Sequence, residues 1–75
     1  MANLTMKDKE ILVAFASNGM NISRTAFATA MHRKTITYHL NSVMRKTGHD
    51  PYDFYALIHL LRVECLGDKD DSQLN

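Results

Sequence analysis

The sequence predicts an all-α domain of four helices, and three observations support this prediction. No stretch alternates apolar and polar residues as a half-buried strand does, whereas apolar residues recur at helical spacing. Only three Gly and one Pro interrupt 75 residues, of which 45% are hydrophobic, so the composition is that of a globular chain. Residues suited to begin and end helices divide the chain into four segments, at about 6–17, 22–29, 33–47 and 51–66.

The first two helices have polar residues at their expected starts. Thr5 is placed to cap the first helix, with Asp8 three residues later as the second half of a capping box. Gly19 supplies the left-handed stop, and Asn21 is the expected cap of the second helix. One face of the first helix is expected to be buried, and its residues are Ile11, Leu12 and Phe15.

The last two helices have similar boundary signals. The third is expected to follow His32 as its cap and to end at Gly48. Asp50 is the expected cap of the fourth helix, with Pro51 in the first turn, where its missing N–H group costs nothing.

The chain is expected to form one domain of residues 1–66, followed by a polar tail of residues 67–75 that we expect to be disordered. Cys65 is the only cysteine and has no internal partner, which favours a reducing, cytoplasmic setting. The longest apolar run has six residues, so we expect no membrane span and no secretion signal.

Charge is divided unevenly along the chain. Residues 20–49 contain five Lys and Arg and no acid, whereas residues 50–75 contain six acids against Arg62 and Lys69. Such a basic centre suits a polyanion. An ordinary solvated helix face that happens to be basic is the alternative.

The third helix has two contrasting faces at 100° per residue. Within about 60° of one another lie the expected inner residues Ile36, Leu40, Val43 and Thr47. The opposite stripe consists of Lys34, Tyr38, Asn41 and Arg45, with Thr37 at its edge. The absence of acids over four turns is what a helix lying against phosphates requires.

Two short helices joined by a turn of about three residues, the second longer and basic, describe a helix-turn-helix. Ala26 lies where the two helices are expected to cross most closely. Met31 and Ile36 are placed to fill the small core between them.

The segment NISRTAFATAMHRKTITYHLNSVMRKTGHD resembles the C-terminal DNA-binding domain of the PucR/CdaR family of bacterial regulators. It is also similar in pattern to the LuxR/NarL and Fis helix-turn-helix domains. The positions that match the PucR/CdaR pattern are Asn21, Ser23, Thr25, Ala26, His32, Arg33, Thr35, Tyr38, Leu40, Thr47, Gly48 and Asp50.

The resemblance implies a sequence-specific bacterial or phage transcription regulator that binds double-stranded DNA, with the third helix in the major groove. It also implies a place in the bacterial cytoplasm, in association with the nucleoid. The expected base contacts are Arg33, Lys34, Thr35, Thr37, Tyr38 and Asn41. The expected phosphate contacts are Ser23, Arg24, Thr25, His32, Arg45 and Lys46.

The sequence departs from the family pattern at four positions. Ala30 stands at the turn position that usually holds Gly, and Thr29 stands where relatives usually bury a leucine. Thr37 and Tyr38 replace residues that are often Arg or Lys, which predicts weaker phosphate affinity.

The fourth helix is apolar nearly all round, which predicts a homodimer. Its expected core residues are Phe54, Leu57, Ile58 and Leu61. Three others then have nothing to cover them and are the expected dimer contacts, Tyr55, Leu60 and Val63. The alternative is that the first helix covers this surface.

No pattern of residues indicates an enzyme, a cofactor, a metal site or a small-molecule site. His32 and His39 are seven residues apart, and His59 and Cys65 six apart, which is not ligand spacing. His39 is expected to be a half-buried packing residue. The rival function is a helical protein-interaction module, such as an accessory or anti-activator factor, that does not bind DNA. Met1 and the acidic end favour a self-contained polypeptide, with a piece of a longer regulator as the alternative.

Overall fold

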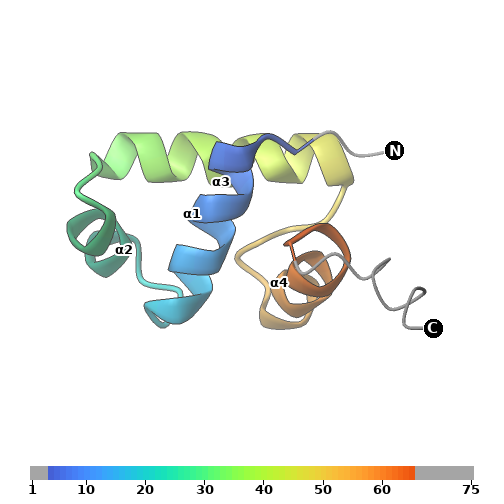
Figure 1. Ribbon diagram of the computed structural model, residues 1–75. Helices are drawn as coiled ribbons and strands as arrows, with labels where there is room; N and C mark the ends of the chain where they lie inside the picture. The colour runs from blue at the N-terminus through green and yellow to red at the C-terminus, as the bar shows by residue number, and fades with distance from the viewer. Residues whose placement is uncertain (1–3, 66–75) are drawn as a thin grey trace.

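The computed structural model describes residues 4–65 as an assembly of helices (Figure 1). In chain order these are α1 (Met6–Ser17), α2 (Ile22–Thr29), α3 (Arg33–Thr47) and α4 (Phe54–Leu60), which a short π-helix, η1 (Leu61–Cys65), continues. The described residues contain no strand, so the predicted all-α, four-helix fold is confirmed. Residue 66 and the predicted tail of residues 67–75 lie outside the described residues.

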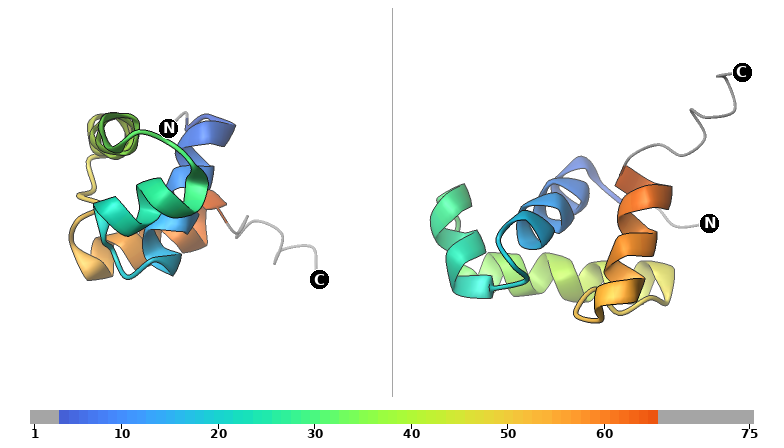
Figure 2. Two further views of the ribbon diagram at one scale, coloured as in Figure 1. Left: turned by 90° about the vertical axis from the view of Figure 1, so that its left-hand side faces the viewer. Right: turned by 90° about the horizontal axis from the view of Figure 1, so that it is seen from below.

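The long helix α3 forms one side of the molecule, and the other helices all lie on a single side of α3 (Figure 1). α1 crosses the middle of α3, α2 lies beneath its N-terminal end, and α4 lies beneath its C-terminal end (Figures 1 and 2). This arrangement covers one face of α3 and leaves the other face open along its length.

The capping box predicted at α1 is present. The Thr5 hydroxyl accepts a hydrogen bond from the Asp8 N–H at 3.0 Å, and the Asp8 carboxylate accepts one from the Thr5 N–H at 3.1 Å. Asn21 caps α2 by accepting from the Arg24 N–H at 2.9 Å. His32 precedes α3 without a side-chain cap, and Gly48 ends it at φ 78°.

The predicted start of the fourth helix at residue 51 is wrong. The Asp50 carboxylate accepts from the Tyr52 N–H at 2.9 Å, which closes a turn instead of capping a helix. Asp53 is the actual cap, and its carboxylate accepts from the Ala56 N–H at 3.0 Å. Pro51 is buried within the turn, and the ring of Tyr52 contacts the core at Phe15, with centroids 5.7 Å apart.

The core combines residues from all four α-helices. Its buried apolar residues are Ile11, Leu12, Phe15, Ala26, Ile36, Leu40, Val43, Leu57 and Leu60. The inner faces predicted for the first and third helices are therefore correct, except that Thr47 is only partly buried. Met31 packs against this cluster as a partly buried residue.

The face predicted for the fourth helix is rotated from the observed one. Leu57 and Leu60 are each 1% exposed, whereas Phe54 and Ile58, which we expected in the core, are 57% and 38% exposed. Leu60 is therefore wrong as a dimer contact. The prediction failed because this helix is apolar nearly all round, so that no polar stripe fixes which side is buried.

The turn between α2 and α3 is left-handed at Ala30, with φ 59° and ψ 34°. A side chain with a Cβ atom pays a steric cost in this conformation. The Thr29 hydroxyl donates to the Thr25 carbonyl at 2.7 Å, so its polar group is satisfied within α2.

Among the described residues, no helix has both the length and the apolar character needed to cross a membrane.

We predict that Ala30→Gly raises the free energy of unfolding by about 1 kcal/mol, because glycine adopts the left-handed conformation without the Cβ cost. Ala28→Gly is the matched control, since Ala28 is exposed within α2 and should lose about 1 kcal/mol. Urea denaturation of both variants measures the two shifts, and shifts of the same sign would contradict the strain assigned to Ala30.

Candidate nucleic-acid interface

The outward face of α3 is an exposed, acid-free surface. Its polar and cationic side chains stand clear of the core because the apolar stripe of the same helix is buried against α1 and α2. Tyr38 is 62% exposed, and its ring packs edge-on against the His39 ring, with centroids 5.2 Å apart. We call this surface the α3 face, and its exposed residues are Arg33, Lys34, Tyr38, Asn41 and Arg45.

The start of α3 meets the start of α2 at a shallow cleft of about 360 Å³. Its lining, Ile22, His32, Arg33, Lys34 and Thr37, brings together residues from both helices and includes no acid. The structure thus places three of the expected base contacts and one expected phosphate contact around a single depression.

Threonine hydroxyls near this cleft are mostly occupied by the backbone of their own helices. Thr37 donates to the carbonyl oxygens of Arg33 and Lys34, at 3.3 and 3.1 Å. Thr35 is partly buried, whereas Ser23 and Arg24 are exposed at the start of α2. Thr25 is fully buried and donates to the Asn21 carbonyl at 2.7 Å, so the prediction that its side chain contacts phosphate is wrong.

A buried ion cluster lies beside the α3 face, where α3 meets α1. The Asp8 carboxylate is 2% exposed, and it lies 2.7 Å from His39 Nδ1 and 2.8 Å from Lys46 Nζ. With the Thr5 N–H, three groups hydrogen-bond to this one carboxylate. Lys46 is therefore engaged in an ion pair, and it must leave Asp8 before it can reach a phosphate.

Burial raises the pKa of Asp8, but the hydrogen bonds from His39, Lys46 and the Thr5 backbone outweigh burial and lower it from 3.8 to about 2. The carboxylate is thus ionised at neutral pH. Its negative charge is enclosed between α1 and α3, away from the α3 face.

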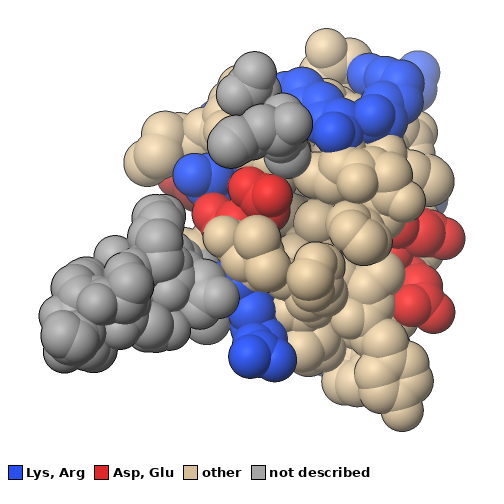
Figure 3. Space-filling model, turned by 90° about the vertical axis from the view of Figure 1, so that its right-hand side faces the viewer, with Lys and Arg blue, Asp and Glu red and all other residues tan. Residues whose placement is uncertain are grey.

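Figure 3 shows one end of the molecule, and there the largest group of Lys and Arg side chains lies along the edge formed by α3. The acidic side chains of this view lie below that edge. On this face of the described residues, a group of cations therefore lies along α3, and the acidic side chains lie away from that edge.

Sequence reasoning missed the partners of Asp8 and the exposure of Phe27. Asp8 is 31 residues from His39 and 38 from Lys46, and no local pattern links positions so far apart. Phe27 is 90% exposed on α2, although an aromatic residue in a short helix would ordinarily be assigned to the core.

Comparison with models of known protein families matches residues 9–62 to the PucR C-terminal helix-turn-helix domain. The match covers all of α2, α3 and α4 and most of α1. No curated protein and no solved structure gave a significant match.

We predict that Asp8→Asn lowers the free energy of unfolding at pH 7 by about 2 kcal/mol, which corresponds to the lowered pKa. The folded-state pKa lies below the ordinary value of 3.8, so the carboxylate stabilises the fold above about pH 4. This stabilisation should disappear as the pH falls toward 2, and the wild type and the variant should then converge.

Urea denaturation between pH 2 and pH 7 measures this dependence. Glu10→Gln is the control, because Glu10 is exposed and its pair with Lys7 at 3.2 Å is a surface pair worth well under 1 kcal/mol. A constant difference between wild type and Asp8→Asn across this pH range would show that the charge of Asp8 does not stabilise the fold.

Proposed function

Because the chain belongs to the family of PucR C-terminal helix-turn-helix domains, we propose that it is a sequence-specific DNA-binding transcription regulator that inserts α3 into the major groove. One observation carries the proposal: the α3 face has exposed cations and hydrogen-bonding side chains, and its helix contains no acid. Each carboxylate on such a face would be repelled by phosphate.

The α3 face supplies the donors and acceptors that base recognition requires. Arg33 or Lys34 donates to guanine O6 and N7, and Asn41 pairs with adenine through its amide. The Thr37 methyl group meets a thymine methyl, since its hydroxyl donates to the helix backbone. Tyr38 and Thr35 complete the proposed set of base contacts.

Phosphate contacts surround this set. Ser23 and Arg24 lie in the first turn of α2. The Arg24 N–H donates to Asn21, but the N–H groups of Ile22 and Ser23 lack intrahelical acceptors and favour an anion. His32 lies at the turn into α3, and Arg45 extends the contact along the far end of the helix. Lys46 joins this set only when it is released from Asp8.

We further propose that the chain forms a homodimer through α4 and η1. Exposed apolar side chains on α4 and η1 leave apolar surface in contact with water, which in so small a domain favours a protein contact. Of the dimer contacts expected from the sequence, Tyr55 is 80% and Val63 42% exposed. The proposed setting is the bacterial cytoplasm, in association with the nucleoid.

The alternative is a helical protein-interaction module whose basic face binds an acidic protein. Both functions use the exposed cations of the α3 face, but only the DNA-binding function predicts binding to duplex DNA. A protein partner would not require hydrogen-bonding groups placed at the spacing of base edges.

We predict that Arg33→Ala and Lys34→Ala each weaken binding to a selected duplex by about 10- to 100-fold, because each removes a contact to bases or phosphates. Helical content and the melting temperature should not change, since both side chains are exposed. Lys7→Ala is the matched control, because Lys7 is an exposed cation on α1 outside the proposed interface.

Fluorescence anisotropy with duplexes selected from a random pool measures these affinities, and a salt titration separates the two functions. Affinity for random duplex should fall steeply between low and physiological salt, as displaced counterions require. An affinity that stays flat, or the absence of duplex binding, would reject the DNA-binding proposal. Unfolding of the Arg33 and Lys34 variants would mean that the exposed and buried faces are assigned wrongly.

A further inference from the structure

The outward face of α4 carries a surface that is largely apolar and that DNA binding by α3 does not use. We call it the α4 patch, and it consists of Phe54, Tyr55 and Ile58 of α4 and Arg62 of η1. Phe54, Tyr55 and Ile58 are 57%, 80% and 38% exposed. Adjacent exposed aromatic residues leave apolar surface in contact with water, which is unfavourable in a small domain and indicates an interface.

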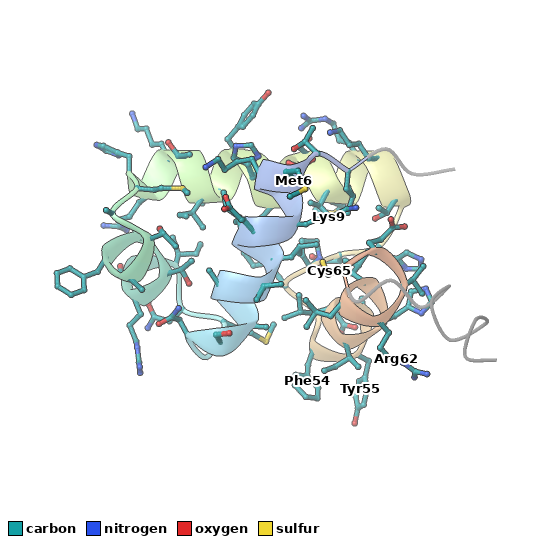
Figure 4. The ribbon with its side chains drawn as sticks, viewed as in Figure 1. Met6, Lys9, Phe54, Tyr55, Arg62 and Cys65 are labelled. Carbon is teal, nitrogen blue, oxygen red and sulfur yellow. The ribbon has the colours of Figure 1, made fainter. Side chains whose placement is uncertain are left out.

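The α4 patch lies on the side of the molecule opposite the α3 face. Leu60 is buried and lines a cleft together with Lys46 and Thr47, so it points toward the end of α3. Ile58 lies about 160° around the helix from Leu60 and therefore points away from α3. Figure 4 shows the side chains of Phe54 and Tyr55 directed away from α3, with Arg62 beside them.

We propose that a second copy of this chain packs against the α4 patch, with the two α4 helices antiparallel, and that this dimer holds two separate DNA duplexes. The second part of this inference rests on the proposed DNA binding by α3. It specifies how the proposed homodimer is used.

The sequence of the α4 patch is complementary to itself. Phe54 lies four residues before Ile58, and Arg62 lies four residues after it. When two antiparallel helices cross at Ile58, Arg62 lies against the partner's Phe54, where a guanidinium is attracted to the aromatic ring. Asp53 next to Phe54 adds a carboxylate near the same guanidinium, because only its Oδ2 atom is used in capping α4.

The size and composition of the α4 patch fit a modest dimer interface. Aromatic residues and arginine are enriched at protein interfaces and dominate their binding energy. Covering these side chains on two copies removes on the order of 1,000 Å² from water, which is the lower limit for a specific interface. We therefore expect a reversible dimer that forms at micromolar concentrations.

Symmetry then decides how the dimer meets DNA. In a two-fold dimer the contacting surfaces face each other, so any surface opposite the contact faces outward on both copies. Because the α3 face is opposite the α4 patch, the two α3 helices point in opposite directions. Two half-sites on one duplex require both helices on the same side, about one helical turn apart. The dimer therefore bridges two duplex segments.

Sedimentation velocity without DNA tests the contact itself. The wild type should be a dimer at tens of micromolar. Ile58→Glu should be a monomer because it places like charges together at the two-fold axis. Tyr55→Glu should be a monomer because it replaces aromatic contact area in the interface by a charge that must lose its water. Phe27→Glu is the matched control, since Phe27 is 90% exposed on α2 at the other end of the molecule, and it should remain a dimer. Tyr55→Glu also avoids misfolding, because Tyr55 has few contacts to lose at 80% exposure.

A capture assay tests the bridge. Bead-bound duplex with bound protein should retain a second, labelled duplex when the wild type or Phe27→Glu is used. Tyr55→Glu should bind each duplex with an affinity within a few-fold of wild type in a monomeric titration, yet retain at least tenfold less labelled duplex. Arg33→Ala should still sediment as a dimer.

The outcomes separate the two proposals. A wild-type monomer at tens of micromolar, or a dimer that Tyr55→Glu and Ile58→Glu leave intact, would overturn the α4 contact while duplex binding stands. A dimer that binds one duplex with both copies and retains no second duplex would overturn the bridge alone. Failure to bind any duplex would overturn the proposed function, and the bridge with it, even if the dimer forms.

Discussion

The placement of α3 depends on one buried carboxylate. Asp8 caps α1 through Thr5 and also binds His39 and Lys46 of α3, so a single side chain sets the start of one helix and holds a second against it. A buried carboxylate is stable only when its oxygens are satisfied, and here the Thr5 N–H, His39 and Lys46 satisfy them and lower the pKa of Asp8 to about 2. Among the described residues, no other acid forms an ion pair with α3.

This arrangement divides the charges of α3 between its two sides. His39 and Lys46 face Asp8, whereas the cations of the α3 face have no acidic partner among the described residues. The helix that stabilises the buried carboxylate through His39 and Lys46 is thus the same helix that exposes the cations of the α3 face. On the far side of the domain, α4 exposes aromatic residues and η1 contributes Arg62. The two surfaces have different chemistry and opposite directions, which fits nucleic acid on one and protein on the other.

The sequence predicts the buried face of a helix well when apolar and polar residues lie on opposite sides of that helix. The third helix has an apolar stripe opposite a polar one, so its buried residues and its exposed cations follow from helical periodicity. The predicted phosphate contact of Thr25 was wrong because its hydroxyl donates to the backbone of its own helix turn. This hydrogen bond allows a polar side chain to be buried. The fourth helix gave the wrong face because nearly all of its positions are apolar, and Asp50 and Asp53 both carry the chemistry of a cap.

The sequence by itself determined the number of helices, most of their ends, the turn at Ala30 and the acid-free side of α3. These features depend on residues within a few positions of one another, where capping and periodicity act. Only the tertiary structure decided that Asp8 meets His39 and Lys46, and which side of α4 is buried. Those outcomes depend on contacts between residues more than thirty positions apart or on which neighbouring helix covers a uniformly apolar surface. The order of residues along the chain does not specify such contacts until the helices pack.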